Sequence, residues 1–351
     1  MKSQVQAYFD SKNISSKANS EMVFKTIALL TLTFGSYALI MSSQVPLFGM
    51  WGLTVLMGIG VAGIGFSISH DALHGAYSSN KYVNRVLGFT FELVGASGYI
   101  WKIKHNIVHH TYTNIHDVDD DINLSPLLRL SSGAPHYFYQ KHQHIYAFIA
   151  YGFTTLQWVF IKDYQNLLKK NLGPYERMEH PIHEVLFLLV MKVVYYLYMI
   201  VIPLLVLDIR WWQFVIGFMT IHFIAGMILS IVFQLAHVVE GPEQFSCDES
   251  GVMENVWLVH EMKTTANFDS QNKLLNWYVG GLNFQIEHHL FPKICSVHYP
   301  AISPIIRRVA EKHNIPYHYH PTLGKAILSH YRMLKQLGEK GTPATSTASV
   351  S

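Results

Sequence analysis

Four long apolar stretches dominate the hydrophobic pattern of the chain. They cover residues 22–42, 47–69, 185–207 and 211–236. Each is long enough to cross a bilayer as a helix, which takes about 20 residues. The connections at 43–46 and 208–210 are so short that consecutive stretches must fold back on each other. The pattern therefore predicts two transmembrane helical hairpins.

Two weaker apolar stretches lie between the hairpins. Residues 86–101 are too few and too glycine-rich for a span, and residues 145–161 fall short of a full crossing. We expect interfacial or re-entrant helices at both places. A fifth span at 145–161 is the alternative, but an odd number of spans would put the histidine clusters described below on opposite faces of the membrane.

The composition supports a lipid environment. Half of the 351 residues are hydrophobic and only 14% are charged, whereas a soluble domain carries about 25% charged residues. No linker divides the chain, so we expect one membrane domain over residues 1–340. The small polar residues 341–351 are expected to form a disordered tail. The polar N-terminal 21 residues do not have the pattern of a signal peptide.

The distribution of basic residues predicts the orientation. The long middle segment is rich in lysine and arginine, namely Lys81, Arg85, Lys102, Lys104, Lys141, Lys162, Lys169 and Lys170. The loops on the other side carry Arg210 as their one basic residue. The positive-inside rule then places both termini and the middle segment in the cytosol. In that compartment Cys247 and Cys295 are expected to be free thiols.

The net charge excludes one class of partner. A net charge of +3, with no glycine-rich phosphate loop and no basic-aromatic motif, gives no support to nucleic-acid binding.

Histidine is unusually frequent, with 21 residues against 23 Asp and Glu combined, and it is the commonest metal ligand. His70 and His74 follow the second span at a spacing of four, so a continuing helix would put both imidazoles on one face. Asp71 would lie about 100° away, which makes it a poor candidate for the same site.

A second cluster contains His105, His109 and His110. On an α-helix the first two share a face and His110 points about 100° away, so this triple could serve two metal ions. The acidic run that follows, Asp117 and Asp119 to Asp121, is expected to be a solvated loop together with His116.

The third cluster is His288 and His289, preceded by Gln285. Adjacent histidines diverge on a helix, so they too could bind different ions. His237 closes the fourth span at the membrane boundary, as His74 follows the second. His222 lies deep within the fourth span, and we interpret it as a hydrogen-bonded packing residue.

The number and type of these residues narrow the choice of metal ion. Catalytic zinc sites use about three protein ligands, so eight imidazoles exceed the needs of one zinc ion. They suit two iron ions that keep open positions for dioxygen, the reagent needed to attack an unactivated C–H bond. The position beside the bilayer implies an acyl substrate. A zinc-dependent membrane hydrolase or receptor, or a non-catalytic metal-binding protein, remains an alternative.

Taken together, the three boxes resemble those of the membrane fatty-acid desaturases. Gln285, in place of a histidine in the third box, is similar to the front-end subgroup, which inserts a double bond between an existing one and the carboxyl end. Further segments over about residues 7–337 resemble cyanobacterial-type Δ6 acyl-lipid desaturases. They are His-Asp-Ala-Leu-His-Gly-Ala-Tyr-Ser-Ser-Asn from His70, Trp-Lys-Ile-Lys-His-Asn from Trp101, His-His-Thr-Tyr-Thr-Asn from His109, Leu-Ala-His-Val-Val-Glu from Leu235, Thr-Thr-Ala-Asn-Phe from Thr264 and Gly-Gly-Leu-Asn from Gly280.

The resemblance implies an all-α integral membrane enzyme with four transmembrane helices, interfacial helices and a cytosolic di-iron cap. It implies that the iron ligands are His70, His74, His105, His109, His110, His237, His288 and His289. Gln285 would be a weak or water-mediated partner, and His260 a candidate ligand or outer-sphere residue.

The implied reaction is dioxygen-dependent insertion of a cis double bond, at Δ6 of linoleate or α-linolenate in acyl-lipid or acyl-CoA form. Other front-end positions (Δ5 or Δ8) and a membrane hydroxylase with the same histidine boxes are the enzymatic alternatives. The chain has no His-Pro-Gly-Gly motif of a fused cytochrome b5 domain, so we expect a separate electron donor, ferredoxin or cytochrome b5.

Overall fold

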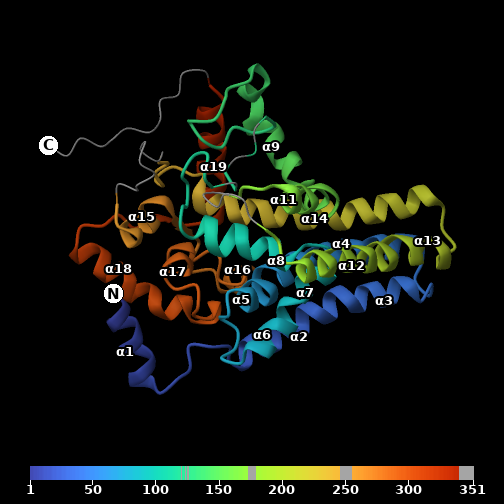
Figure 1. Ribbon diagram of the computed structural model, residues 1–351, viewed down its shortest axis with the longest axis horizontal. Coiled ribbons are helices and arrows are strands. Elements are labelled where there is room, and N and C mark those ends of the chain that lie inside the picture. Colours follow the sequence, from blue (N-terminus) through green and yellow to red (C-terminus); the bar gives the residue numbers. More distant parts are fainter. Residues whose placement is uncertain (120, 123, 125, 173–178, 246–254, 340–351) are drawn as a thin grey trace.

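Four long helical segments lie side by side along the long axis of the molecule (Figure 1). The computed structural model describes all residues except 120, 123, 125, 173–178, 246–254 and 340–351. The spans cover Ser20–Met41, Leu47–Leu73, Ile182–Val206 and Trp211–His237. The predicted four spans and two hairpins are therefore confirmed, with ends within a few residues of those expected. Cys247 and the tail at 341–351 lie outside the described residues.

Three of the four spans are interrupted by short π-helical segments. The first consists of α2 (Ser20–Leu30), η1 (Thr31–Gly35) and α3 (Ser36–Met41), and the second of α4 (Leu47–Gly63), η2 (Ile64–Ser69) and α5 (His70–Leu73). The third consists of α12 (Ile182–Tyr196), η6 (Leu197–Val201) and α13 (Ile202–Val206), whereas the fourth is the single helix α14 (Trp211–His237).

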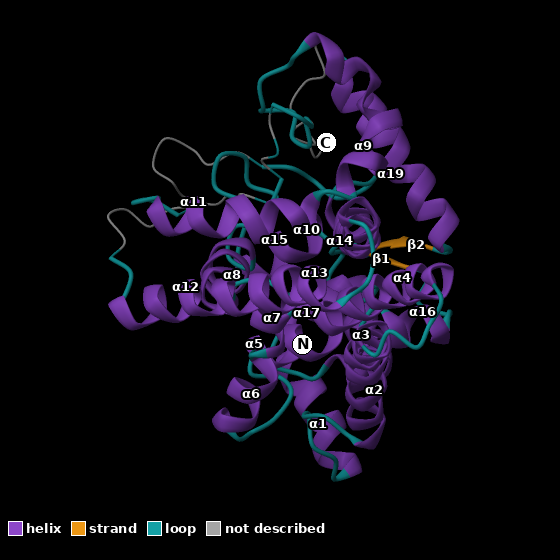
Figure 2. Cartoon of the chain, turned by 90° about the vertical axis from the view of Figure 1, so that its right-hand side faces the viewer, coloured by secondary structure: helices purple, strands orange, loops and turns teal. Residues whose placement is uncertain are grey.

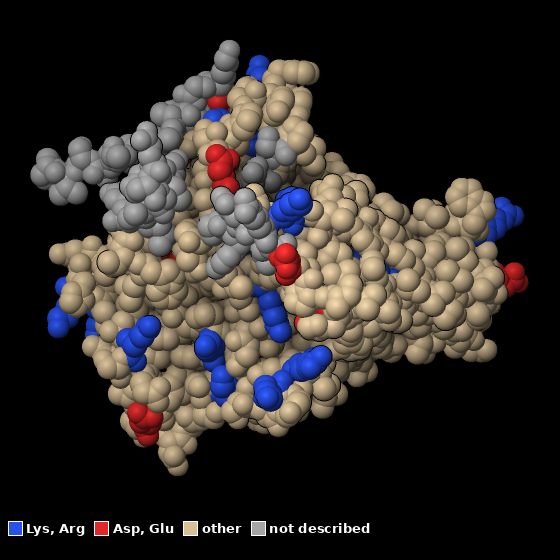
Figure 3. All heavy atoms as spheres, in the orientation of Figure 1, with Lys and Arg blue, Asp and Glu red and all other residues tan. Residues whose placement is uncertain are grey.

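The surface of these spans is apolar. Many large hydrophobic side chains on them are exposed, among them Phe24, Phe48, Leu205 and Trp211. In the view of Figure 3 the rod formed by the spans is largely free of charged side chains up to its tip, whereas Lys and Arg gather toward the other end of the molecule. A long uncharged apolar surface of this kind matches the hydrocarbon core of a bilayer.

The remaining described elements form a cap at one end of the rod (Figure 1). Between the hairpins the chain forms α6 (Lys81–Gly88), α7 (Thr90–Leu93), α8 (Gly98–Trp101), η3 (Lys102–His109), η4 (Phe138–His142), α9 (Gln143–Tyr151), α10 (Thr154–Gln157), η5 (Trp158–Lys162) and α11 (Asp163–Leu168). The terminal parts form α1 (Lys2–Lys12), α15 (Trp257–Thr264), α16 (Lys273–Tyr278), α17 (Gln285–Leu290), η7 (Ser296–His298), α18 (Tyr299–Lys312) and α19 (Leu323–Gly338).

Two short parallel strands join the part of the cap that follows α14 (Figure 2). Strand β1 (Ala266–Phe268) pairs with β2 (His318–His320), with Asn267 opposite Tyr319. The pairing joins the segment between α15 and α16 to the segment between α18 and α19.

The stretch expected to be interfacial or re-entrant is a broken helix that packs on the fourth span. Helices α9 and α10 are separated by a turn at Gly152, and Thr155 Oγ1 donates a hydrogen bond to the carbonyl oxygen of His222 in α14 (2.8 Å). The stretch is not among the four spans found in the described residues. The other weak stretch, 86–101, is likewise divided among short helices.

The close approach of α10 to α14 depends on Gly226. A Cβ atom there would lie 2.8 Å from the carbonyl oxygens of both Tyr151 and Gly152. Small residues at helix crossings allow this approach in membranes, where packing rather than the hydrophobic effect holds helices together.

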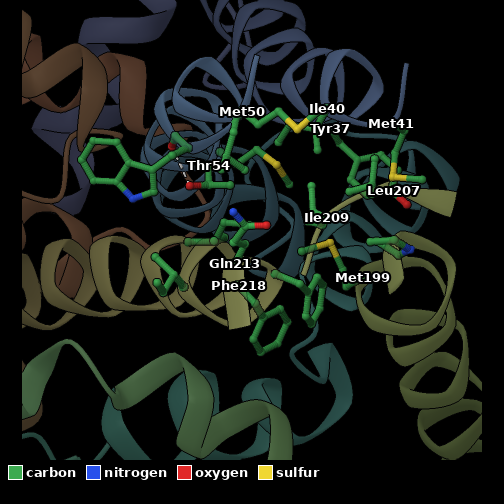
Figure 4. Close-up of a pocket in the computed structure, with 18 of the residues that line it drawn as sticks. Tyr37, Ile40, Met41, Met50, Thr54, Met199, Leu207, Ile209, Gln213 and Phe218 are labelled. Carbon is green, nitrogen blue, oxygen red and sulfur yellow. Dashed lines mark hydrogen bonds between the residues drawn. The ribbon is translucent and has the colours of Figure 1, made fainter. Parts of the chain in front are cut away.

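At the tip of the rod, the two hairpins enclose an apolar cavity (Figure 4). Methionine and aromatic side chains such as Tyr37, Met50, Met199 and Phe218 line it. No histidine is among the described residues around this cavity, so the search for a reaction centre turns to the cap.

Replacing Gly226 with alanine is expected to lower the melting temperature of the detergent-solubilised protein. The added methyl group meets backbone oxygens that cannot move aside easily, and such overpacking costs about 1–3 kcal/mol. Thermal unfolding followed by size-exclusion chromatography measures the change.

Gly52→Ala is the matched control, because a Cβ atom at Gly52 has no neighbour within 4 Å. Its melting temperature should equal or slightly exceed that of the wild type, since alanine is the better helix former. Equal melting of the two variants would refute the packing role of Gly226.

Candidate metal centre

The eight predicted histidines meet in one buried space beside the cytosolic ends expected for the spans. They come from the end of the second span, from η3, from the end of α14 and from α17. Seven are buried and His74 is partly buried. Their ligand atoms lie within 4.8 Å of one another in three groups: His70, His74, His105 and His288; His109, His237 and His289; and His110, His288 and His289.

The grouping shows how the boxes are shared. His105 and His109 belong to different groups, and the adjacent residues His288 and His289 do as well, although both also join His110. His110 therefore lies between the two outer groups. Each of these groups of three or four imidazoles could hold a metal ion.

The second box is not on an α-helix, which corrects the expectation from its spacing. Residues Lys102–His109 form the π-helix η3, and the amide of His110 donates to the carbonyl of His105. The wider turn brings His110 Nε2 to 3.3 Å from His105 Nε2, whereas an α-helix would turn these two side chains apart. Short π-helical segments are rare and often occur at functional sites.

Several ring nitrogens in this space lack a hydrogen-bond partner within the described chain. They are Nδ1 of His70 and His110, and Nε2 of His74, His109, His237, His288 and His289. Buried polar atoms are almost always satisfied, so a cluster of orphaned nitrogens indicates a missing group. A metal ion accepts lone pairs from several imidazoles at once, and the donor set therefore fits a metal.

Four of these rings have a partner outside the eight histidines at their other nitrogen; for His288 it is Tyr299 Oη, 3.3 Å from Nδ1. His109 Nδ1 donates to Asp119 Oδ2 (3.0 Å), His289 Nδ1 donates to Glu261 Oε2 (2.7 Å), and His237 Nδ1 faces the carbonyl of Thr264 (3.4 Å). Because carboxylate and carbonyl oxygens accept hydrogen bonds, the proton sits on Nδ1 and the lone pair on Nε2. Such outer partners orient metal-binding histidines and raise their basicity.

Asp119 and Glu261 were not foreseen as part of the site. The acidic run was expected to be solvated, but Asp119 is 1% exposed and only Asp117 of the described run is fully exposed. Asp119 also accepts the amide of Asn114, which holds the loop over the site. The run has the composition of a surface loop, so its burial could not be read from the sequence.

His260 lies outside the three histidine groups. Its Nε2 is 2.8 Å from the carbonyl oxygen of Thr113, and it is the next residue, Glu261, that contacts His289. This geometry gives no support to His260 as a metal ligand. The outer-sphere contact expected of His260 is instead made by Glu261. Glu261, in the segment Trp-Leu-Val-His-Glu, stands at no recognisable spacing from the histidine boxes, so the sequence pattern could not identify it.

Asp71 is confirmed as a residue outside the histidine groups. Its Oδ2 accepts hydrogen bonds from Ser296 Oγ (2.9 Å), the Ser296 amide (3.0 Å) and the Cys295 thiol (3.1 Å). This network ties the first box to the segment after the third box. Cys295 is a buried free thiol, as expected.

The predicted packing role of His222 is also confirmed. Its Nε2 lies 2.9 Å from Tyr195 Oη and its Nδ1 lies 3.1 Å from Thr155 Oγ1. Both nitrogens are satisfied, in contrast to the orphaned nitrogens of the cap.

Electrostatics keep most of the clustered imidazoles neutral. Burial, followed by repulsion from neighbouring histidines, lowers the pKa of His74, His105, His110, His288 and His289 well below the usual value. Burial also opposes protonation of His109, but the charge and hydrogen bond of Asp119 raise the pKa of His109 on balance. Neutral imidazoles are the form that binds metals.

A cavity of about 160 Å³ opens onto the histidines. His70, His105, His288 and Gln285 line one part of it. Apolar and aromatic residues from several elements form most of the remainder, among them Phe66, Phe91, Ile100, Trp101, Leu229 and Phe233. Its charged residues are Lys104, Asp121, Lys162 and Asp163. Gln285 thus faces the cavity beside the histidines.

The sequence model of the fatty acid desaturase family matches residues 46–321. The chain belongs to this family. Its matched region contains all eight clustered histidines and the four elements that carry them.

Curated relatives agree with this assignment. The sn-1 linoleoyl-lipid 6-desaturase of Arthrospira platensis is 35% identical over 335 residues, which cover 95% of this chain and 90% of the relative. That of Synechocystis is 36% identical over 342 residues, or 96% and 94% of the two chains. An acyl-lipid (8-3)-desaturase of Physcomitrium patens is 32% identical over 345 residues, or 96% and 71%. This desaturase is therefore an integral membrane oxidoreductase of lipid metabolism.

Glu261→Gln is expected to reduce the bound metal and the activity of this desaturase by about 10–100-fold, the usual effect of losing an outer partner of a metal-binding histidine. The amide can turn its NH₂ group toward His289 Nδ1, which disturbs the tautomer and the orientation of the ring. Elemental analysis of purified protein and a product assay measure the two effects.

Glu243→Gln is the control, because Glu243 is part-exposed and lies 3.7 Å from Lys263 rather than beside a histidine. It should behave as the wild type. Full metal content and activity in Glu261→Gln would remove Glu261 from the site.

Proposed function

We propose that this desaturase is a front-end enzyme that inserts a cis double bond at Δ6 of an acyl chain such as linoleate or α-linolenate. The observation that carries the proposal is the convergence of eight histidines in one space, where three of them, His70, His105 and His288, line a mostly apolar cavity. The two cyanobacterial relatives are both named linoleoyl-lipid 6-desaturases, which supports Δ6 and a lipid-bound substrate. Because a relative acts at another position, Δ5 and Δ8 are outcomes of the test below.

We propose two iron ions as the cofactor, held by His70, His74, His105, His109, His110, His237, His288 and His289. The number of imidazoles, their division into groups and their orphaned nitrogens support two ions. When bound, the iron ions activate dioxygen, so that two hydrogens leave adjacent carbons and, with two electrons and two protons from outside, dioxygen is reduced to water.

The residues of the chain supply orientation and water exclusion. The aromatic and aliphatic cavity wall holds the acyl chain against His70, His105 and His288 and keeps bulk water from the reacting carbons. Trp101 stacks on His105, with ring centroids 4.3 Å apart, and so limits the motion of both groups. Asp119 and Glu261 keep the rings of His109 and His289 in the tautomer with the proton on Nδ1. Gln285, buried on the same wall, is placed to bind a water or the chain.

Three further parts of the proposal concern orientation and partners. The excess of lysine and arginine on the histidine side supports a cytosolic active site with both termini in the cytosol. The substrate is proposed to be an acyl-lipid, with acyl-CoA as the alternative. A separate ferredoxin or cytochrome b5 as electron donor stays a prediction of the sequence.

Expression in a host fed linoleate is expected to produce γ-linolenate. Fatty-acid methyl esters analysed by mass spectrometry locate the new double bond, and separation of the lipid classes before hydrolysis identifies the acyl carrier. A different isomer would overturn Δ6, and an alcohol in place of an alkene would indicate a hydroxylase.

Alanine replacement of each of the eight histidines is expected to reduce desaturation by more than about 100-fold, because losing a metal ligand should cost at least as much as losing an outer partner. His313→Ala is the control, since His313 is exposed at the end of α18. Elemental analysis of the wild type should find iron near two per chain. One zinc per chain and no oxygen requirement would favour a zinc-dependent hydrolase instead, and an active His237→Ala would remove His237 from the ligand set.

A further inference from the structure

Lys192 is a buried cation near the middle of the third span. It lies within α12 and is only 3% exposed. An ammonium group at membrane depth is costly, so such residues face the protein interior, pair with partners and usually mark function. The histidine centre and its outer partners make no use of this lysine.

The Nζ atom of Lys192 joins two segments that are far apart in the sequence. It donates to Asp163 Oδ2 (2.7 Å), to the carbonyl of Gly95 (2.7 Å) and to the carbonyl of Val159 (3.1 Å). These are three good acceptors for the three donors of an ammonium group. Asp163 also accepts a hydrogen bond from the backbone of Ser97, so the carboxylate joins the same two segments.

Both segments are places where regular α-helix is interrupted. Gly95, with φ of +91°, lies in the turn between α7 and α8, and Val159 lies in the π-helix η5. Carbonyl groups freed by such breaks at membrane depth need internal donors. Tyr196, one turn along α12 from Lys192, donates a second hydrogen bond to the Val159 carbonyl (3.0 Å).

The same two segments form part of the wall of the histidine-lined cavity. Ala96 and Ser97 follow Gly95, while Trp158, Lys162, Asp163 and Asn166 come from η5 and α11. Lys192 itself is not among the described residues that line the cavity. It therefore acts from behind the wall, as a positioning residue rather than a catalytic one.

We propose that the Lys192–Asp163 pair fixes the spacing of these two wall segments and thereby selects which acyl carbons lie beside the histidines. The inference rests on the proposed desaturase function. It assigns the pair a role in the position of the double bond, because a wall that shifts lets the same chain slide along the cavity without disturbing the histidines themselves. A buried ion pair is weak evidence for stability, whereas the hydrogen bonds of Lys192 to both wall segments tie the pair to the shape of the cavity.

The test compares the double-bond positions made by the wild type, Lys192→Met, Asp163→Asn and the double variant Lys192→Met/Asp163→Leu in cells fed linoleate. Mass spectrometry gives the ratio of misplaced to correct double bonds, and immunoblots give the amount of each protein in membranes. Lys192→Met is expected to raise this ratio about tenfold, the effect of losing about 1.4 kcal/mol of discrimination between two positions.

The double variant separates positioning from folding. Replacing both charges with apolar groups should restore the protein level lost in the single variants, but the carbonyls of Gly95 and Val159 still lack their ammonium donor. We therefore expect misplaced double bonds to persist in the double variant. Lys170→Met, which removes an exposed lysine from the same side, is the control and should match the wild type.

An unchanged product distribution in all variants, with activity that follows the amount of protein, would overturn the proposal. If Lys192→Met does not accumulate, Asp163→Asn and Tyr196→Phe decide, and an unchanged distribution in both has the same meaning. The wild-type arm tests the proposed function separately. If the wild type forms no double bond, the proposed function fails; if it forms one at another carbon, the variants are compared with that carbon.

Discussion

Eight imidazole rings share one buried space at the end of the spanning helices, and the rest of the cap is arranged around the requirements of these rings. Neutral imidazoles can be packed together, but their orphaned nitrogens demand a cation, and a cation demands compensating charge. Asp119 and Glu261 lie one step out, each hydrogen-bonded to the far nitrogen of a histidine. Asp71 binds the first box to the segment after the third. These carboxylates thus help to hold the centre together, and Asp119 also forms a group with His109 and Asp121 whose ligand atoms lie within 4.8 Å of one another.

The bilayer imposes a second requirement, which concerns the backbone. Helices that bring histidines from four directions to one point cannot all be regular, and breaks occur at Gly95, at Gly152 and in the π-helical segments. In hydrocarbon each freed carbonyl must find a donor within the protein. The third span supplies donors through Lys192 and Tyr196, while Thr155 and His222 satisfy each other across α10 and α14. Polar residues inside the membrane therefore support the irregular walls of the cavity.

The clustered imidazoles and the irregular backbone segments with internal hydrogen bonds both form walls of the same cavity. One part of its wall is made of histidines and Gln285, and another part is made of the segments joined by Lys192 and Asp163. Membership in the fatty acid desaturase family explains why a centre of this kind faces an apolar space. In the proposed reaction, the position of the double bond depends on how the acyl chain is placed along that space. Residues remote from the proposed metal ligands would therefore influence the product.

The sequence by itself determined the four spans, the two hairpins and seven of the eight histidines that meet, because these depend on hydrophobic length and on spacings of a few residues. It also indicated the eighth, His237, through its place at the end of a span. Only the tertiary structure decided that His105 and His110 approach each other on a π-helix, that Asp119 is buried, and that Glu261 contacts His289. The pairing of Lys192 with Asp163 belongs to the same group. The π-helix is a local departure that spacing alone does not reveal. The contacts of Glu261 with His289 and of Lys192 with Asp163 depend on packing, because the partners are 28 and 29 residues apart and local pattern does not encode such pairings.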